Sequence, residues 1–310
     1  MNKRGKMLLS LCLIAGLLLS GCQKSDQTKT SDTLNIVATT TMLADLASEI
    51  GKEHVTVNGL MGPGIDPHLY QASAGDVTLM QNADVVVYNG LHLEGKMGEI
   101  FQSLTDRGST VICIEDGLPK NRLLSWEDDS SVHDPHIWFD VSLWKSAAGT
   151  VAEKLSEADS DHADDYKKNL EAYIKELDSL DEYVKEKINE IPKEQRVLIT
   201  AHDAFQYFGK AYGMEVRGLQ GISTDAEAGT ADVSSLAQFI TDRKIKAIFV
   251  ESSVPPKTIE ALKAAVQSKG FDVVIGGELY SDSLGGENSG AETYLLTIKA
   301  NVDTIVNALK

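Results

Sequence analysis

The sequence predicts an α/β protein made of two α/β lobes with largely parallel sheets, joined by one long helix. Short β-rich apolar runs alternate with stretches of helical period along most of the chain. Such alternation is typical of parallel sheets covered by helices. Residues 84–88 and 110–114 are continuous apolar runs, as expected for strands buried on both faces. A long charged stretch, residues 142–191, separates the two halves.

The elements follow one another in the same order in both halves. In the first half, the pattern predicts strands over 34–39, 55–61, 84–88 and 110–114, and helices near 41–51, 74–82 and 96–106. In the second half, it predicts strands over 197–200, 216–219, 247–251 and 272–275, and helices near 203–212, 232–243, 256–269 and 291–309.

The charged middle stretch carries apolar residues at helical spacing, and it ends before Pro192, where a helix stops. A break near Ser160 and Asp161 is compatible with the pattern. A dimerising coiled coil is the alternative, but the spacing is not a strict heptad. We therefore expect a monomer with an N-terminal lobe at 34–150, a linking helix at 151–191 and a C-terminal lobe at 192–310.

The N-terminus has the pattern of a bacterial lipoprotein signal. Three basic residues precede an apolar run over 7–19, which ends in Leu19-Ser20-Gly21-Cys22. The run is shorter than the roughly 20 residues of a membrane-spanning helix. We expect a signal peptide at 1–21, lipid on Cys22 and a polar tether at 22–33. The mature protein would then be held by its lipid on the extracellular face of the cell membrane.

Composition excludes several function classes. Removing the 21-residue signal, which has three basic residues and no acidic one, takes the net charge from −17 to −20. Such a chain lacks the basic surface of a nucleic-acid binder. Of the three cysteines, Cys12 leaves with the signal and Cys22 carries lipid, while Cys113 lies in an apolar run and is expected to be a buried thiol. A disulfide framework and a cysteine-type zinc site are both excluded.

Three of the seven histidines lie in unusual contexts. His68 and His136 each end an Asp-Pro-His tripeptide, and proline makes such a loop stiff. His202 directly follows the strand at 197–200, at the sheet edge where open α/β folds place their ligands. Asp282 lies in a loop that follows the last strand and leads to Gly285. Together they predict a four-ligand cation site between the lobes.

The mixed ligand set narrows the choice of ion. Imidazole suits zinc and other transition metals, while carboxylate suits manganese and magnesium, so Mn²⁺ or Zn²⁺ fits best. Four carboxylates are candidates to accept the second imidazole N–H, namely Asp66, Asp134, Asp203 and Glu251. Capping of the local turn is the alternative for the Asp-Pro pairs.

The remaining histidines and two aromatic residues have weaker patterns. His54 and His162 are expected on the exposed surface. His92 is a candidate to line the space between the lobes, and His133 a candidate auxiliary group near His136. Residues 138–139, a Trp-Phe pair, are expected either to wall the site or to pack in the core.

Several segments together resemble one family of known proteins. They are 62–73, 91–95, 134–139, 200–213, 218–224 and 250–254, and the similarity covers essentially the whole mature chain. The chain resembles the metal-binding solute-binding lipoproteins of bacterial zinc and manganese ABC importers, and most of all the manganese-binding lipoproteins of Gram-positive bacteria. The resemblance implies two α/β lobes joined by a long helix, with metal in the cleft.

The resemblance places the ligands on His68, His136, His202 and Asp282. Many manganese-binding members have glutamate at the third position, where this chain has His202. Against zinc, residues 121–132 contain no histidine, whereas many zinc-specific members carry a His-rich loop there. Manganese is therefore the expected cargo, with zinc as the alternative. The implied partners are a membrane permease and its ATPase.

Two other classes of function remain open from the sequence. An extracellular zinc hydrolase would need an open coordination position and a general base. The chain contains no His-Glu-x-x-His helix and no clear nucleophile motif, so we expect that it is not an enzyme. A surface adhesin would need an exposed apolar or aromatic patch, and the acidic composition with only three tryptophans argues against one.

Overall fold

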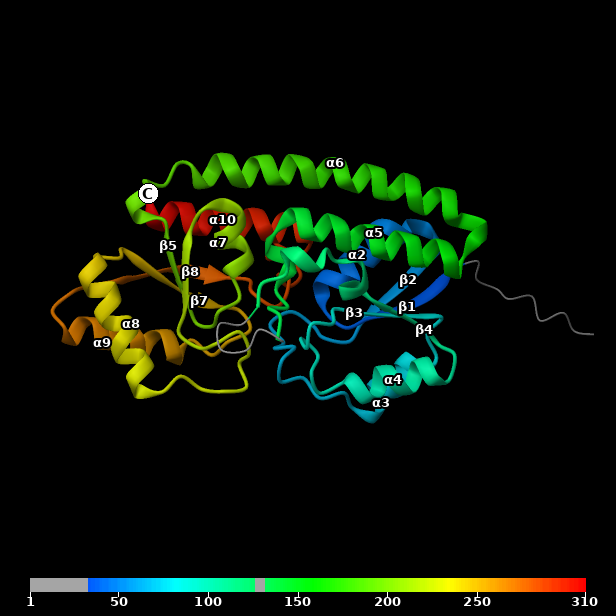
Figure 1. Ribbon diagram of the computed structural model, residues 1–310, viewed down its shortest axis with the longest axis horizontal. Helices are drawn as coiled ribbons and strands as arrows, with labels where there is room; N and C mark the ends of the chain where they lie inside the picture. The colour runs from blue at the N-terminus through cyan, green and yellow to red at the C-terminus, as the bar shows by residue number, and fades with distance from the viewer. Residues whose placement is uncertain (1–32, 126–131) are drawn as a thin grey trace, which may run out of the picture. The chain divides into compact units, whose positions relative to one another are not determined.

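The N-terminal lobe is built on one parallel sheet. The computed structural model describes residues 33–125 and 132–310 (Figure 1). The sheet has the order β2-β1-β3-β4, and all its pairs are parallel. Its strands are β1 (Leu34–Ala38), β2 (Val55–Gly59), β3 (Val85–Tyr88) and β4 (Thr110–Cys113). The predicted strands and their parallel arrangement are therefore confirmed in this half of the chain.

Helices cover both faces of this sheet, which explains the continuous apolar runs of its strands. They are α2 (Thr41–Gly51), α3 (Ala74–Gln81) and α4 (Gly98–Asp106). Val85 and Val87 pack in the main core with α2, while Val86 faces a second core with Met80 and Phe101 of the other two helices. Alternate residues of β3 thus serve opposite faces, as a doubly covered strand requires.

The C-terminal lobe contains two parallel strand pairs. These are β5 (Val197–Thr200) with β6 (Glu215–Gly218), and β7 (Ala247–Glu251) with β8 (Val274–Leu279). Its helices are α7 (Gln206–Tyr212), α8 (Thr230–Arg243) and α9 (Lys257–Ser268). Strand β8 begins and ends later than predicted. It continues through Gly276 and Gly277, where its register with β7 is irregular. Glycines weaken the strand pattern in the sequence.

Two helices, rather than one, occupy the charged middle stretch. Helix α5 (Val141–Ala158) and helix α6 (Ala163–Ile188) are separated by the 3-10 turn Ser160–His162. The predicted boundary at 150/151 therefore falls inside α5. Helix α6 packs on α5 and α2 and also on α10 (Tyr294–Leu309), so it contacts elements from both halves of the chain (Figure 1). The exact domain bounds remain a prediction.

Short 3-10 turns complete the connections. They are Lys52–His54, Ile114–Gly117, Lys120–Arg122, Ser160–His162, Lys193–Gln195 and Ile137–Phe139, the last of which follows His136. Within the described part of the chain, none of the helices is long and apolar enough to cross a membrane. The predicted signal peptide, Cys22 and most of the tether lie outside the described residues.

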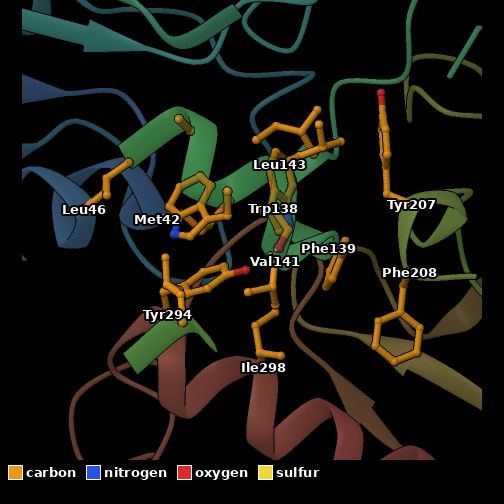
Figure 2. Close-up of a cluster of buried hydrophobic side chains, with 14 of the residues drawn as sticks. Met42, Leu46, Trp138, Phe139, Val141, Leu143, Tyr207, Phe208, Tyr294 and Ile298 are labelled. Atoms are coloured by element: carbon orange, nitrogen blue, oxygen red, sulfur yellow. Dashed lines mark hydrogen bonds between the residues drawn. The ribbon is translucent and has the colours of Figure 1, made fainter. Parts of the chain in front are cut away.

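The main hydrophobic core continues from one lobe into the other. Figure 2 shows Trp138 and Phe139 between Met42 and Leu46 of α2, the α7 side chains and the α10 side chains. The indole of Trp144 stacks on Tyr294 with ring centroids 4.8 Å apart. The Tyr294 hydroxyl donates to the Trp138 carbonyl at 2.7 Å. Because a large apolar contact opposes relative domain motion, this core holds the lobes together.

Candidate metal centre

Four side chains from four different loops converge between the lobes. His68 lies between β2 and α3, His136 precedes the turn Ile137–Phe139, and the other two follow β5 and β8. One nitrogen or oxygen from each of His68, His136, His202 and Asp282 lies within 4.8 Å of all the others. All four residues are buried. The structure thus brings together the four ligands predicted from the sequence.

The distances fit a single cation at the centre of the group. The Nε2 atom of His136 lies 3.2 Å from that of His68 and 3.4 Å from that of His202. The Asp282 oxygens face the same nitrogens, Oδ1 at 3.4 Å from His136 and Oδ2 at 3.4 Å from His202. Among the described residues, buried Asp282 Oδ1 has no hydrogen-bond partner. A buried carboxylate oxygen without a donor fits a bound cation.

Two of the histidines have a carboxylate behind them. His136 Nδ1 donates to Asp134 Oδ1 at 2.7 Å, and the backbone N–H of His136 donates to the same oxygen at 2.9 Å. His202 Nδ1 donates to Glu251 Oε2 at 2.6 Å, while its backbone N–H donates to Oε1 at 2.9 Å. A carboxylate on Nδ1 fixes the tautomer, so Nε2 offers its lone pair to the site.

The other two candidate carboxylates have different partners. Asp66 Oδ1 accepts from the backbone N–H of His68 at 2.9 Å, and Oδ2 accepts from the Thr224 hydroxyl at 2.6 Å. Asp203 Oδ1 accepts from the Gln206 side chain at 2.7 Å. Within residues 33–125 and 132–310, neither accepts an imidazole N–H, so the structure differs from the predicted role at both positions. Asp66 instead caps the turn at its own Asp-Pro pair, which is the alternative role that the sequence allows.

Asp282 is held by contacts that the sequence analysis missed. The Ser253 hydroxyl donates to Asp282 Oδ2 at 2.9 Å and lies 2.9 Å from the Ser281 hydroxyl. The indole N–H of Trp138 donates to the Ser281 carbonyl at 2.9 Å. Ser253 lies two residues after Glu251, at the end of β7, and this strand-end position was the available signal. Trp138 packs in the core and also connects the His136 loop to the Asp282 loop.

Burial and charge act differently on the three imidazoles. Burial lowers the pKa of His68 to about 3, and it outweighs the opposing effect of Asp282. Burial alone would lower the pKa of His136, but the carboxylates of Asp134 and Asp282 outweigh burial and raise that pKa to about 9. In the same way, Glu251 and Asp282 outweigh burial and hold the pKa of His202 well above its ordinary value. Without metal, the imidazoles of His136 and His202 therefore bind protons more readily than an ordinary histidine does.

The pKa of Asp282 moves in the opposite direction. Burial would raise it, but the adjacent His202 and His136 imidazoles outweigh burial and hold it well below its ordinary value. Asp282 is therefore ionised and offers a negative charge to a cation.

The other histidines lie outside this group. His133 Nδ1 is 3.3 Å from the Ser125 hydroxyl, and His92 is exposed. His54 and His162, predicted to be exposed, are partly buried and stack with ring centroids 3.9 Å apart. His54 also pairs with Asp165 at the start of α6, and His162 pairs with Asp159, three residues before it. This stack joins segments far apart in the sequence, so local pattern could not reveal it.

Comparison with known proteins agrees with this geometry. The family model described as zinc-uptake complex component A, periplasmic (ZnuA), matches residues 36–308. The manganese-binding lipoprotein MntA of Bacillus subtilis is 43% identical over 304 residues, covering 98% of this chain and 99% of the relative. The zinc-binding protein TroA of Treponema pallidum is 49% identical over 275 residues, covering 88% of each chain. The solved TroA structure has a TM-score of 0.86 and 48% identity, covering 89% of this chain and 99% of that chain.

The fold and the buried His/Asp group therefore define a metal-binding solute-binding protein of an ABC importer. This chain belongs to the ZnuA family, whose members bind solutes for import and are not enzymes. The hydrolase alternative is excluded by this membership. The matched relatives include both a manganese-binding and a zinc-binding protein, so the comparisons leave the choice between these two metals open.

Proposed function

We propose that this chain captures Mn²⁺ outside the cytoplasmic membrane and delivers it to an ABC permease driven by an ATPase. His68, His136, His202 and Asp282 would be the ligands. Asp134 and Glu251 would orient two of the rings through their Nδ1 atoms. Lipid on Cys22 would keep the protein at the extracellular face of the membrane.

The orientation of Asp282 is the observation that supports manganese as the cargo. Each of its two oxygens faces a different imidazole nitrogen at 3.4 Å, so one carboxylate can offer both oxygens to an ion held by the three rings. This gives five donor atoms, three nitrogens and two oxygens. Zn²⁺ favours four donors in a tetrahedron, whereas carboxylate oxygens suit Mn²⁺. Similarity to MntA over nearly the whole of both chains supports the same metal.

Zinc import is the second candidate, and the similarity to TroA favours it. At nitrogen-rich sites Zn²⁺ normally binds more tightly than Mn²⁺. We therefore expect the isolated protein to bind Zn²⁺ at least as tightly as Mn²⁺. Selection for manganese in the cell would then depend on geometry and on release to the permease.

A deletion strain tests this proposal in the cell. We expect poor growth and low cellular manganese when manganese is limiting, and rescue by the wild-type gene but not by a His68→Ala gene. A strain that is short of zinc but normal in manganese would replace manganese with zinc in the proposal. A strain that is normal in both metals would contradict an import function and would favour the surface adhesin.

A further inference from the structure

One loop of the C-terminal lobe reaches across to the N-terminal lobe. The 219–229 loop connects β6 to α8 and is the yellow-green segment between them in Figure 1. The Thr224 hydroxyl donates to Asp66 Oδ2 at 2.6 Å, and Asp225 forms an ion pair with Lys96 at 3.2 Å. None of the four candidate ligands lies in this loop. The loop therefore contacts the N-terminal lobe without supplying a ligand to the metal site.

A single carboxylate joins this loop to a candidate ligand. Asp66 uses Oδ2 for Thr224 and Oδ1 for the backbone N–H of His68, at 2.9 Å. Thr224 is 92% buried, and a hydrogen bond to a charged carboxylate is worth more than one between neutral groups. A shift of His68 would move Asp66, and a shift of Asp66 would break its bond to Thr224. The position of His68 and the position of the loop are thus coupled.

The loop has space behind it in its own lobe. A hollow of about 620 Å³ lies between the two ends of the loop and helix α8, with Gln220 and Ala228 on the loop side and Asp232 and Phe239 on the helix side. Among the described residues, the buried Gln220 Oε1 has no hydrogen-bond partner. The backbone at Gln220 and Gly221 is hydrogen-bonded to its own lobe, so the part of the loop beyond Gly221 is the part with room to move toward the hollow.

The base of the loop is fixed, and so are the lobes. A side chain at Gly218 would come within 2.5 Å of the Asp203 backbone nitrogen, so the chain is tightly packed where the loop begins. The core around Trp138 and Tyr294 continues between the lobes, and opening them widely would expose it. Separation of the lobes would expose that whole core, whereas movement of the part of the loop beyond Gly221 would leave it covered.

We propose that the 219–229 loop is a gate of the metal site and that Asp66 and Thr224 form its latch. Asp66 is then a positioning residue for His68, and it acts in the closed state only when Thr224 holds its other oxygen. Because coupling between two sites is reciprocal, bound metal favours the closed loop by the same factor by which the closed loop retains the metal. The inference rests on the proposed metal-binding function.

The test measures metal release from the full mature protein. Mn²⁺-loaded wild type is mixed with excess chelator and the release rate is recorded, with Zn²⁺-loaded protein in parallel. We expect Thr224→Val and Asp66→Asn each to release metal about tenfold faster or more, as loss of a hydrogen bond to a charged group implies. The double variant should be no faster than the quicker single variant, because both changes break the same bond.

Two control variants separate the latch from general damage to the loop. Ser223→Ala removes the adjacent hydroxyl, whose hydrogen bonds among the described residues are with Asp225 of the same loop. The Asp225–Lys96 ion pair is exposed and contributes little, so this variant should release metal like the wild type. Thr224→Ser keeps the hydroxyl and should restore slow release. Hydrogen exchange of residues 219–229 should slow when metal is added to the wild type, and much less in Thr224→Val.

Two results would overturn the latch. One is a Thr224→Val release rate within about twofold of Ser223→Ala, and the other is loop exchange that does not respond to metal in the wild type. If the wild type binds metal through the four ligands and either result is nevertheless obtained, only the latch is wrong. If neither Mn²⁺ nor Zn²⁺ binds to the wild type, the proposed function and the latch both fail.

Discussion

The Glu251→Gln variant removes a negative charge from behind His202 and keeps the size of the side chain. Glu251 accepts two hydrogen bonds from His202, one from Nδ1 at 2.6 Å and one from the backbone N–H at 2.9 Å. A glutamine has one acceptor oxygen and one amino group. If its oxygen accepts from Nδ1, the amino group meets the backbone N–H, and a buried donor is left without a partner.

The alternative orientation of the glutamine is no better for metal binding. An amino group facing Nδ1 would force the ring proton onto Nε2, the atom that faces the ion. Loss of a hydrogen bond to a charged group costs about 1.5–3 kcal/mol, which corresponds to roughly a 10- to 150-fold loss of affinity. This range agrees with the typical 10- to 100-fold effect of removing a carboxylate behind a metal-bound histidine.

Competition with a chelator of known affinity measures the loss. Glu278→Gln is a matched control, because Glu278 is an exposed residue of β8 and pairs across the ladder with Val250 of β7. We expect the control to bind metal like the wild type and Glu251→Gln to bind it at least tenfold more weakly. Equal affinity of the two variants would refute the idea that Glu251 orients His202 for metal binding.

Three further outcomes follow from the site and the N-terminus. Chelation should lower the melting temperature of the wild type, since a ligand at a thousandfold excess over its dissociation constant stabilises by about 4 kcal/mol; calorimetry should show most of this shift lost in His68→Ala or Asp282→Ala, and an unchanged shift in both would place the site elsewhere. Metal binding should release protons and weaken as the pH falls, because the pKa of His136 is raised to about 9 and that of His202 well above its ordinary value, so these rings bind protons that metal must displace. Calorimetry in buffers of different ionisation enthalpy measures the release, and constant affinity between about pH 6 and pH 8 would contradict it. Mass spectrometry of the native N-terminal peptide should find Cys22 as the first residue and lipid on its sulfur, whereas an unmodified Cys22 would disprove the anchor.

The ligand positions could be predicted because each has a local signal. His68 and His136 end stiff Asp-Pro-His loops, and His202 follows a buried strand directly. Parallel strands bring their carboxyl ends to one edge, so local position was enough to suggest convergence. Most element boundaries were also predictable, since each buried strand or helix has its own hydrophobic period.

The partners of the ligands could not be predicted in the same way. Asp66 and Asp134 occupy the same place in identical tripeptides, but only Asp134 accepts from an imidazole nitrogen. The difference arises because Asp66 faces Thr224 of the other lobe, and that contact depends on the tertiary fold. The stack of His54 on His162 is likewise a long-range contact. The late end of β8 could not be predicted because the strand continues through Gly276 and Gly277, which weaken the strand pattern in the sequence.

The central claim is that three imidazoles and one carboxylate hold one transported ion, and metal analysis combined with pulsed electron paramagnetic resonance of Mn²⁺-loaded protein tests it most directly. We expect one Mn²⁺ per chain, with magnetic coupling to imidazole nitrogens in the wild type. Bound metal should be lost, or the nitrogen coupling reduced, in His136→Ala and His202→Ala. Bound Mn²⁺ without nitrogen coupling, or the same metal content and spectrum in both variants, would contradict the claim.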